Sequence, residues 1–270
     1  MRVDVQLSPA VETWQTLRDG VRSAEQAGFG SAWVFDHFAG DMLHGVTMLE
    51  CFTLLGALAA STDHIGLGSL VVNVNNRPPG MTATAAASVQ AVSGGRFTLG
   101  LGAGAAPSSR WSEEHRTLGI ELGATLAERH RRLNVMLDEI DRLWGHDRSA
   151  EVATFARPDP RPPIVLGVNS PALAAVAGRR CDGINVRGDH AALEQILRAA
   201  TQARIDAGRT GLEWQSSVWA MWDPRLLDPA HPDVQRWASL GATRLVMVFL
   251  EPHDRAALRS AAEPLRRLAA

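Results

Sequence analysis

The chain of 270 residues is 46% hydrophobic and 21% charged, with a formal net charge of −2, as expected for an ordinary globular protein. All 27 basic residues are arginines, which excludes a Schiff-base or P-loop lysine. They are scattered rather than clustered, so we expect no nucleic-acid partner, and no apolar run approaches the roughly 20 residues that cross a membrane.

The stretch MRVDVQLSPA enters a strand-like alternation without a signal-peptide core. The two cysteines, Cys51 and Cys181, suggest no disulfide framework. The simplest interpretation is a protein of the reducing cytoplasm.

Short β-rich runs alternate with amphipathic stretches along the chain. In chain order, the pattern predicts strand and helix pairs at 2–7 and 11–29, 31–37 and 47–62, 65–73 and 79–93, 96–104 and 125–144, 164–168 and 171 onward, 183–186 and 189–207, 214–222 and 232–240, and 243–250 and 254–270. Gly28 is a plausible helix stop, and Ser170 with Pro171 is a good helix start. Residues 105–119 are predicted to form a loop.

Eight strand–helix units in a chain of this length favour a single-domain (β/α)8 TIM barrel over residues 1–270. Periodicity alone leaves a doubly wound sheet open. Functional groups of such barrels lie at the C-terminal ends of the strands, where Asp36 and His37 follow the second strand. The alternative for this pair is structural, with Asp36 capping a loop and His37 a satisfied rim histidine.

Other chemistries have weaker support in the sequence. The run LGLGAG (99–104) has the spacing GxGxG rather than GxGxxG, and Pro107 follows it where a dinucleotide-binding fold needs a helix. No GxSxG motif of a serine hydrolase is present. The histidines His37, His44 and His64 lack ligand spacing, so we expect no metal site.

Several stretches together resemble the luciferase-like monooxygenase superfamily, in particular its oxidoreductases that depend on the deazaflavin coenzyme F420. The resemblance covers nearly the whole chain and weakens after about residue 210. It is carried by AEQAGFGSAWVFDHF (24–38), ASTDHIGLGSLVVNVNNRPPG (60–80), AVSGGRFTLGLGAG (91–104), LAERHRRLNVMLDEIDRLW (126–144) and PPIVLGVNSPALAAVAGRRCDGIN (162–185).

The resemblance implies a cofactor ring near the ends of strands two to four. His37 would lie beside this ring as the general acid or base, and Asp36 would line the ring pocket and orient His37 or favour its protonated form. A bulge, often with a non-proline cis peptide, maps to Leu70 and Val71. Ala103 and Gly104 would approach the ring or its ribityl chain.

The cofactor phosphate would bind the segment after strand five. The resemblance assigns it to Gly167, Val168, Asn169, Ser170 and Pro171. The residues support this independently, because a small residue, a hydroxyl and free N–H groups at a helix start form an anion site. The alternative is an ordinary capped helix.

Two features depart from the family pattern. Many deazaflavin enzymes carry an acidic residue after the strand-four glycines, whereas this chain has Ala105 and Ala106. Sugar-phosphate dehydrogenase activity is therefore doubtful, and the nearby Glu113 and Glu114 are predicted to be solvated. The segment 145–161 is also short, which predicts a more open site or one completed by a partner subunit.

Three further side chains are interpreted from their position. Arg77 contacts cofactor or substrate, or fixes a loop through carbonyl groups. Trp33 is predicted to pack in the core, and Trp111 is left open between core packing and stacking on a ring.

The resemblance implies an oxidoreductase that transfers a hydride between coenzyme F420 and a small organic substrate. FMN is the alternative cofactor, with a two-component monooxygenase as the corresponding activity. A non-catalytic flavin-binding or partner subunit is the second alternative. Relatives often dimerise, so a homodimer is expected.

Overall fold

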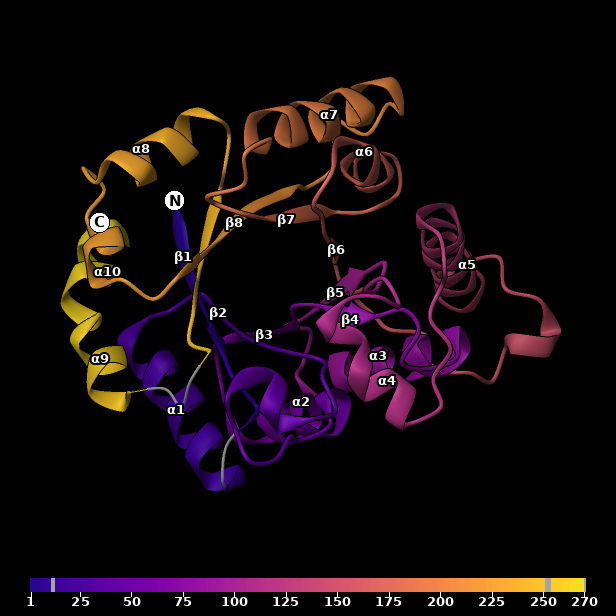
Figure 1. Ribbon diagram of the computed structural model, residues 1–270, viewed down its shortest axis with the longest axis horizontal. Coiled ribbons are helices and arrows are strands. Elements are labelled where there is room, and N and C mark those ends of the chain that lie inside the picture. The colour runs from indigo at the N-terminus through magenta and orange to yellow at the C-terminus, as the bar shows by residue number, and fades with distance from the viewer. Residues whose placement is uncertain (11–12, 251–253, 270) are drawn as a thin grey trace.

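The strands of the chain pair in parallel and close into a ring, seen nearly end-on in the computed structural model (Figure 1). The structure describes residues 1–10, 13–250 and 254–269. The ring runs β1–β2–β3–β5–β6–β7–β8–β9 and returns to β1, with β4 extending the line of β3 and pairing with β5. The strands are β1 (Arg2–Leu7), β2 (Ser31–Val34), β3 (Gly66–Ser69), β4 (Val72–Asn73), β5 (Phe97–Gly102), β6 (Ile164–Gly167), β7 (Gly183–Arg187), β8 (Gln215–Met221) and β9 (Arg244–Val248).

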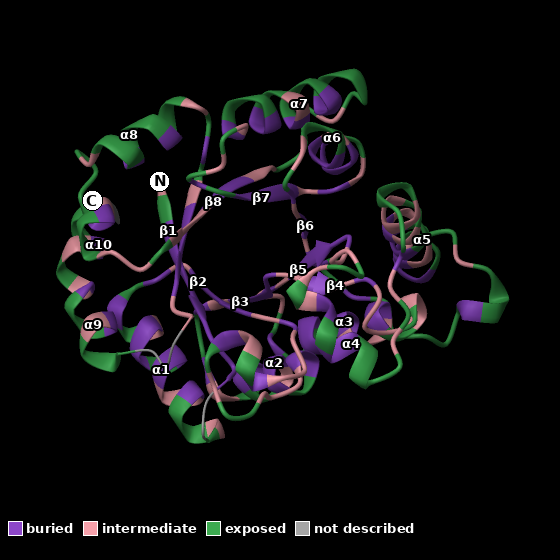
Figure 2. Cartoon of the chain, viewed as in Figure 1, coloured by how far each residue is buried: buried purple, intermediate pink, exposed green. Residues whose placement is uncertain are grey.

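Helices surround this ring and turn their buried faces toward it (Figure 2). They are α1 (Trp14–Ala27), α2 (Cys51–Ser61), α3 (Pro79–Val92), α4 (Glu113–Thr117), α5 (Leu126–Trp144), α6 (Pro171–Arg180), α7 (Leu193–Asp206), α8 (Pro232–Ser239), α9 (Arg255–Ser260) and α10 (Ala262–Ala269). The predicted single-domain (β/α)8 barrel is thereby confirmed. In the described ranges, no helix is long and apolar enough to span a bilayer.

Local sequence explains where the helices begin and end. The Ser170 hydroxyl accepts a hydrogen bond from the Leu173 N–H, and Pro171 occupies the first helical position of α6. Helix α1 stops at Gly28, which adopts the left-handed conformation with φ of 93°. Both helix signals read from the sequence are confirmed.

Some predicted boundaries were wrong. The predicted helix 47–62 begins only at Cys51, because the Glu50 carboxylate caps it by accepting from the Thr53 N–H at 2.7 Å. The predicted loop 105–119 contains the short helix α4, and the predicted helix 254–270 consists of α9 and α10. Residues 11–12, at the start of the predicted helix 11–29, and residue 270 lie outside the described residues.

The third predicted strand is interrupted at the bulge, and the Leu70–Val71 peptide bond there is cis. Glycines on the neighbouring strands make room for the Val71 side chain. A Cβ on Gly102 would lie 2.6 Å from Val71 Cγ2, and one on Gly167 would lie 2.9 Å from Val71 Cγ1. The bulge therefore depends on glycine at both neighbours.

Candidate active site

A cavity of about 590 Å³ opens at the C-terminal ends of the strands. Its lining includes seven residues that the sequence predicted for the site, all near the ends of strands. They are Asp36, His37, Leu70, Val71, Ala103, Gly104 and Gly167. Val168 and Asn169 line it as well. The volume lies within the ~300–1,000 Å³ typical of cofactor and ligand sites.

His37 is paired with a carboxylate from a distant loop. Its Nδ1 lies 2.7 Å from Oε1 of Glu114 in α4, and the imidazole remains 21% exposed while the Glu114 side chain is 1% exposed. Among the contacts of the described residues, none occupies Nε2 of His37. This nitrogen is therefore available for a ligand in the cavity that His37 lines.

The same Glu114 carboxylate also holds the loop that follows His37. Its Oε2 accepts from the N–H groups of Phe38 at 2.6 Å and Ala39 at 3.0 Å. Burial favours the protonated acid, but the His37 bond and the two amides outweigh burial and lower the pKa of Glu114 below its ordinary value. The prediction of a solvated Glu114 was wrong, whereas Glu113 is exposed as predicted.

Asp36 is held by a different partner. Both of its carboxylate oxygens accept from Arg77, at 2.9 and 2.7 Å, and Oδ2 also accepts from the Asn73 N–H and the Asn76 side-chain amide. Arg77 bonds to Glu50 as well, and despite burial these carboxylates raise its pKa. Arg77 thus fixes its loop through carboxylates and not carbonyl groups. Glu114, and not Asp36, orients His37.

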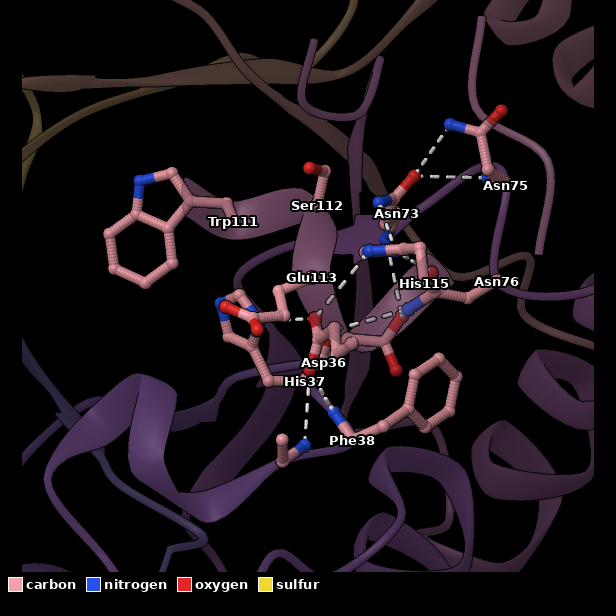
Figure 3. Close-up of polar contacts among 12 residues, drawn as sticks. Asp36, His37, Phe38, Asn73, Asn75, Asn76, Trp111, Ser112, Glu113 and His115 are labelled. Atoms are coloured by element: carbon pink, nitrogen blue, oxygen red, sulfur yellow. Dashed lines mark hydrogen bonds and ion pairs between the residues drawn. The ribbon is translucent and has the colours of Figure 1, made fainter. Parts of the chain in front are cut away.

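A buried histidine follows Glu114 in the chain. His115 Nε2 lies 2.8 Å from Oδ1 of Asn76, which can only accept, and 3.0 Å from Nδ2 of Asn73, which can only donate. Burial is the main cause that lowers the pKa of His115, and it favours the neutral ring. The group ties α4 to the loop that carries Asn76 (Figure 3).

Gly104 gives this polar cluster its space. Its φ is +84°, in the left-handed region, and a Cβ there would meet Oδ1 of Asn73 at 2.7 Å. Oδ1 of Asn73 in turn accepts from the backbone and side-chain N–H groups of Asn75, at 3.0 and 2.8 Å. Any larger residue at 104 would displace this cluster.

Aromatic side chains form the wall next to His37. The centroids of the His37 and Trp111 rings are 5.4 Å apart, and those of His37 and Phe35 are 6.4 Å apart. The Arg110 guanidinium lies over the Trp111 ring, 4.2 Å from the ring centroid. Trp111, which the sequence left open, lines the cavity, while Trp33 is 2% exposed and packs in the core as predicted.

The predicted phosphate segment is only partly at the cavity surface. Gly167, Val168 and Asn169 line the cavity, whereas Ser170 and Pro171 are not among its lining residues. The Ser170 hydroxyl is already engaged as the cap of α6. Three arginines and a histidine from other elements also line the cavity, namely Arg110, Arg129, Arg187 and His130.

Sequence reasoning missed Glu114, His115 and Arg129 as site residues. Glu113 and Glu114 are adjacent residues of the same type, so the sequence does not distinguish them. The position of each on the α4 helix decides that Glu114 is buried and Glu113 is exposed. Arg129 sits in the first turns of α5, within a basic stretch that reads as a solvated face. Of the described residues, Arg129 makes no ion pair with a carboxylate.

Comparison with known families gives a match over most of the chain. Residues 1–216 match the family described as luciferase-like monooxygenase. An F420-dependent glucose-6-phosphate dehydrogenase from Microbacterium testaceum is 32% identical over 69% of this chain and 57% of its own length. One from Beutenbergia cavernae is 30% identical over 84% of this chain and 70% of its own. A 5,10-methylenetetrahydromethanopterin reductase from Methanolobus tindarius is 28% identical over 68% and 55%.

Solved structures share the fold at low sequence identity. An F420-dependent secondary alcohol dehydrogenase in complex with an F420–acetone adduct superposes with a TM-score of 0.77 at 15% identity, over 98% of this chain and 100% of that chain. A monooxygenase from Streptomyces bottropensis gives 0.78 at 16% identity, over 100% of both chains. The chain spans only 57% of the first curated relative described above, so these likenesses establish family and fold.

Proposed function

The chain belongs to the luciferase-like monooxygenase family, and from this premise we propose that it is an oxidoreductase that transfers a hydride between coenzyme F420 and a small organic substrate. The observation that carries the proposal is the His37–Glu114 pair at the wall of the barrel-mouth cavity. The names of the two F420-dependent relatives with 30% identity or more support the choice of cofactor.

His37 is the proposed acid–base group. With its Nδ1–H donated to Glu114, the Nε2 lone pair can accept a proton from a substrate hydroxyl as the substrate is oxidised. The Glu114 carboxylate then stabilises the imidazolium that forms, because the opposite charges lie in hydrogen-bond contact. In the reducing direction, the same nitrogen returns the proton to the substrate oxygen.

The cavity walls fit a deazaflavin. Leu70, Val71 and Ala103 provide an apolar surface for a planar ring, and Gly167 and Asn169 line the part of the cavity that we assign to its phosphate. Arg129 adds positive charge suited to the same anion, and the neighbouring His130 offers ring nitrogens for hydrogen bonds. When bound, the deazaflavin supplies a ring carbon that gives or accepts the hydride.

Asp36 and Arg77 have a supporting role in this proposal. Their bidentate pair fixes the start of the loop that carries His37, and the Asn73 N–H bonded to Asp36 lies just beyond the bulge. Asp36 then lines the ring pocket while neutralised by Arg77. The aromatic rings of Phe35 and Trp111 flank the His37 imidazole.

FMN is the second candidate cofactor. The apolar walls and the cationic mouth suit its ring and phosphate equally, so the cavity shape alone gives no preference. Parallel titrations of the purified protein with F420 and FMN test the proposal. Saturable binding of F420 supports it, and binding of FMN alone would favour an oxygen-using monooxygenase.

We further propose that the protein is a homodimer of the cytoplasm. The resemblance to dimerising relatives supports the first part, and the two cysteines, both free and buried, are consistent with a reducing compartment. Light scattering coupled to size-exclusion chromatography tests the oligomeric state, where a mass near that of one 29.1 kDa chain would contradict a dimer.

A further inference from the structure

Strand β1 sends two polar side chains into the interior of the barrel. Asp4 and Gln6 both have a relative exposure of 0%. Each accepts a hydrogen bond from an indole N–H: Trp33 donates to Asp4 Oδ2 at 3.1 Å, and Trp219 donates to Gln6 Oε1 at 2.8 Å. The barrel interior therefore holds two tryptophan–acceptor pairs, whose acceptors are two residues apart on β1.

Gln6 makes a second bond that Asp4 cannot make. Its Nε2 donates to the carbonyl oxygen of Leu70 at 2.5 Å. The amide orientation is unambiguous, because an indole N–H can only donate and a carbonyl oxygen can only accept. Gln6 is thus bonded simultaneously to β8 and to the bulge after β3.

Both partners of Gln6 belong to the cavity wall. Leu70 and Trp219 line the cavity, and Val71 and Trp219 pack on the buried cluster of Trp33, Leu70 and Val246. Arg187 lies over Trp219, 5.6 Å from the ring centroid. A shift at Gln6 would therefore move two separate parts of the wall.

We propose that Gln6 is a positioning residue that fixes the Leu70–Val71 bulge and the Trp219 indole relative to each other, and so sets the shape of the ring-binding cavity. The inference rests on the proposed function, since it assigns this cavity to the cofactor ring. The Asp4–Trp33 pair is a second indole–acceptor hydrogen bond inside the barrel, in which Asp4 also pairs with Arg244. Neither Asp4 nor Trp33 lines the cavity, so the loss of this bond provides the control.

The contact itself can be tested without any cofactor. Tryptophan labelled with ¹⁵N gives one indole cross-peak for each of the eight tryptophans, and Trp219→Phe identifies the peak of Trp219. Gln6→Met should shift that peak and leave the Trp33 peak, identified by Trp33→Phe, nearly in place. An unmoved Trp219 peak in a folded Gln6→Met protein would overturn the inference.

The positioning role is then tested by F420 titration. Gln6→Met and Trp219→Phe should each raise the Kd about tenfold, as expected for a lost buried hydrogen bond, whereas Trp33→Phe should change it less than about twofold. The isosteric Gln6→Glu serves if Gln6→Met does not fold, because it keeps an acceptor for Trp219. An unchanged Kd in the Gln6 variant, or an equal rise in Trp33→Phe, contradicts the role. If the wild-type protein binds neither F420 nor FMN, the proposed function is contradicted. The shift of the Trp219 indole peak in Gln6→Met then tests the role of Gln6 on its own.

Discussion

His37 Nδ1 lies 2.7 Å from Glu114 Oε1, although the two residues are 77 positions apart in the sequence. The bond joins the loop after β2 to the short helix α4, and the Phe38 and Ala39 amides bonded to the same carboxylate strengthen the junction. One buried acid therefore both orients the proposed acid–base group and anchors the loop that carries it.

Removing the imidazole should abolish most of the turnover. His37→Ala is expected to lower kcat by roughly 10²–10⁴-fold, because a positioned proton donor or acceptor contributes about that much. The Kd for F420 should change little, since the apolar walls and the phosphate contacts remain. Steady-state kinetics and a cofactor titration on the same preparation measure both, and a near-wild-type kcat would remove His37 from the mechanism.

Neutralising Glu114 should lower kcat less than removing the His37 imidazole does. Glu114→Gln keeps the size of the side chain but loses the charge that stabilises the imidazolium, so kcat should fall by about tenfold or more. Glu113→Gln is the matched control, because Glu113 is exposed and adjacent in the chain. Equal kinetics for the two variants would show that the buried carboxylate does not act on His37.

The Asp36–Arg77 pair should be important for folding. Arg77→Ala leaves the fully buried Asp36 carboxylate without its cation, so the free energy of unfolding should fall by about 3 kcal/mol. Arg198→Ala removes a cation from an exposed pair with Glu194 and should cost less than about 1 kcal/mol. Urea unfolding of both variants measures the difference, and a comparable loss in each would contradict the assignment of the buried pair.

His115 should make stability depend on pH. Burial lowers its pKa below the ordinary 6.5, so near neutral pH the ring is neutral in both folded and unfolded chains. As pH falls below about 6.5, the unfolded chain takes up the proton first, and the free energy of unfolding decreases. His115→Gln should flatten this slope below about pH 6.5, as followed by urea unfolding at several pH values.

The exposed His146→Gln variant is the control for this slope. It should unfold with the same pH dependence as the wild type. A His115→Gln protein with an unchanged slope would show that the ring is not held in its neutral form by the fold.

Much of the barrel could be predicted from local patterns. Alternating strands and helices gave the fold, and residues placed at strand ends, such as His37, Val71 and Gly104, do line one cavity. This works because parallel strands in a barrel all end at the same face. The stretch VDVQL shows a complication: its apolar residues face the helices, while the polar Asp4 and Gln6 fill the barrel interior.

The side-chain partnerships could not be predicted. Glu114 reads as a solvated loop residue because its burial depends on α4 folding back onto the loop after β2. Arg77 pairs with Asp36, and Glu114 pairs with His37. Both pairs join loops that only the closed barrel brings together. Because Asp36 and His37 are adjacent in the sequence, Asp36 was predicted to orient His37, and the structure does not contain that contact.

The use of F420 as cofactor is tested most directly by an equilibrium titration of the wild-type protein with F420 and, in parallel, with FMN. We expect saturable binding of F420 that is tighter than that of FMN and persists in His37→Ala. Binding of FMN alone, or of neither cofactor, would contradict this expectation.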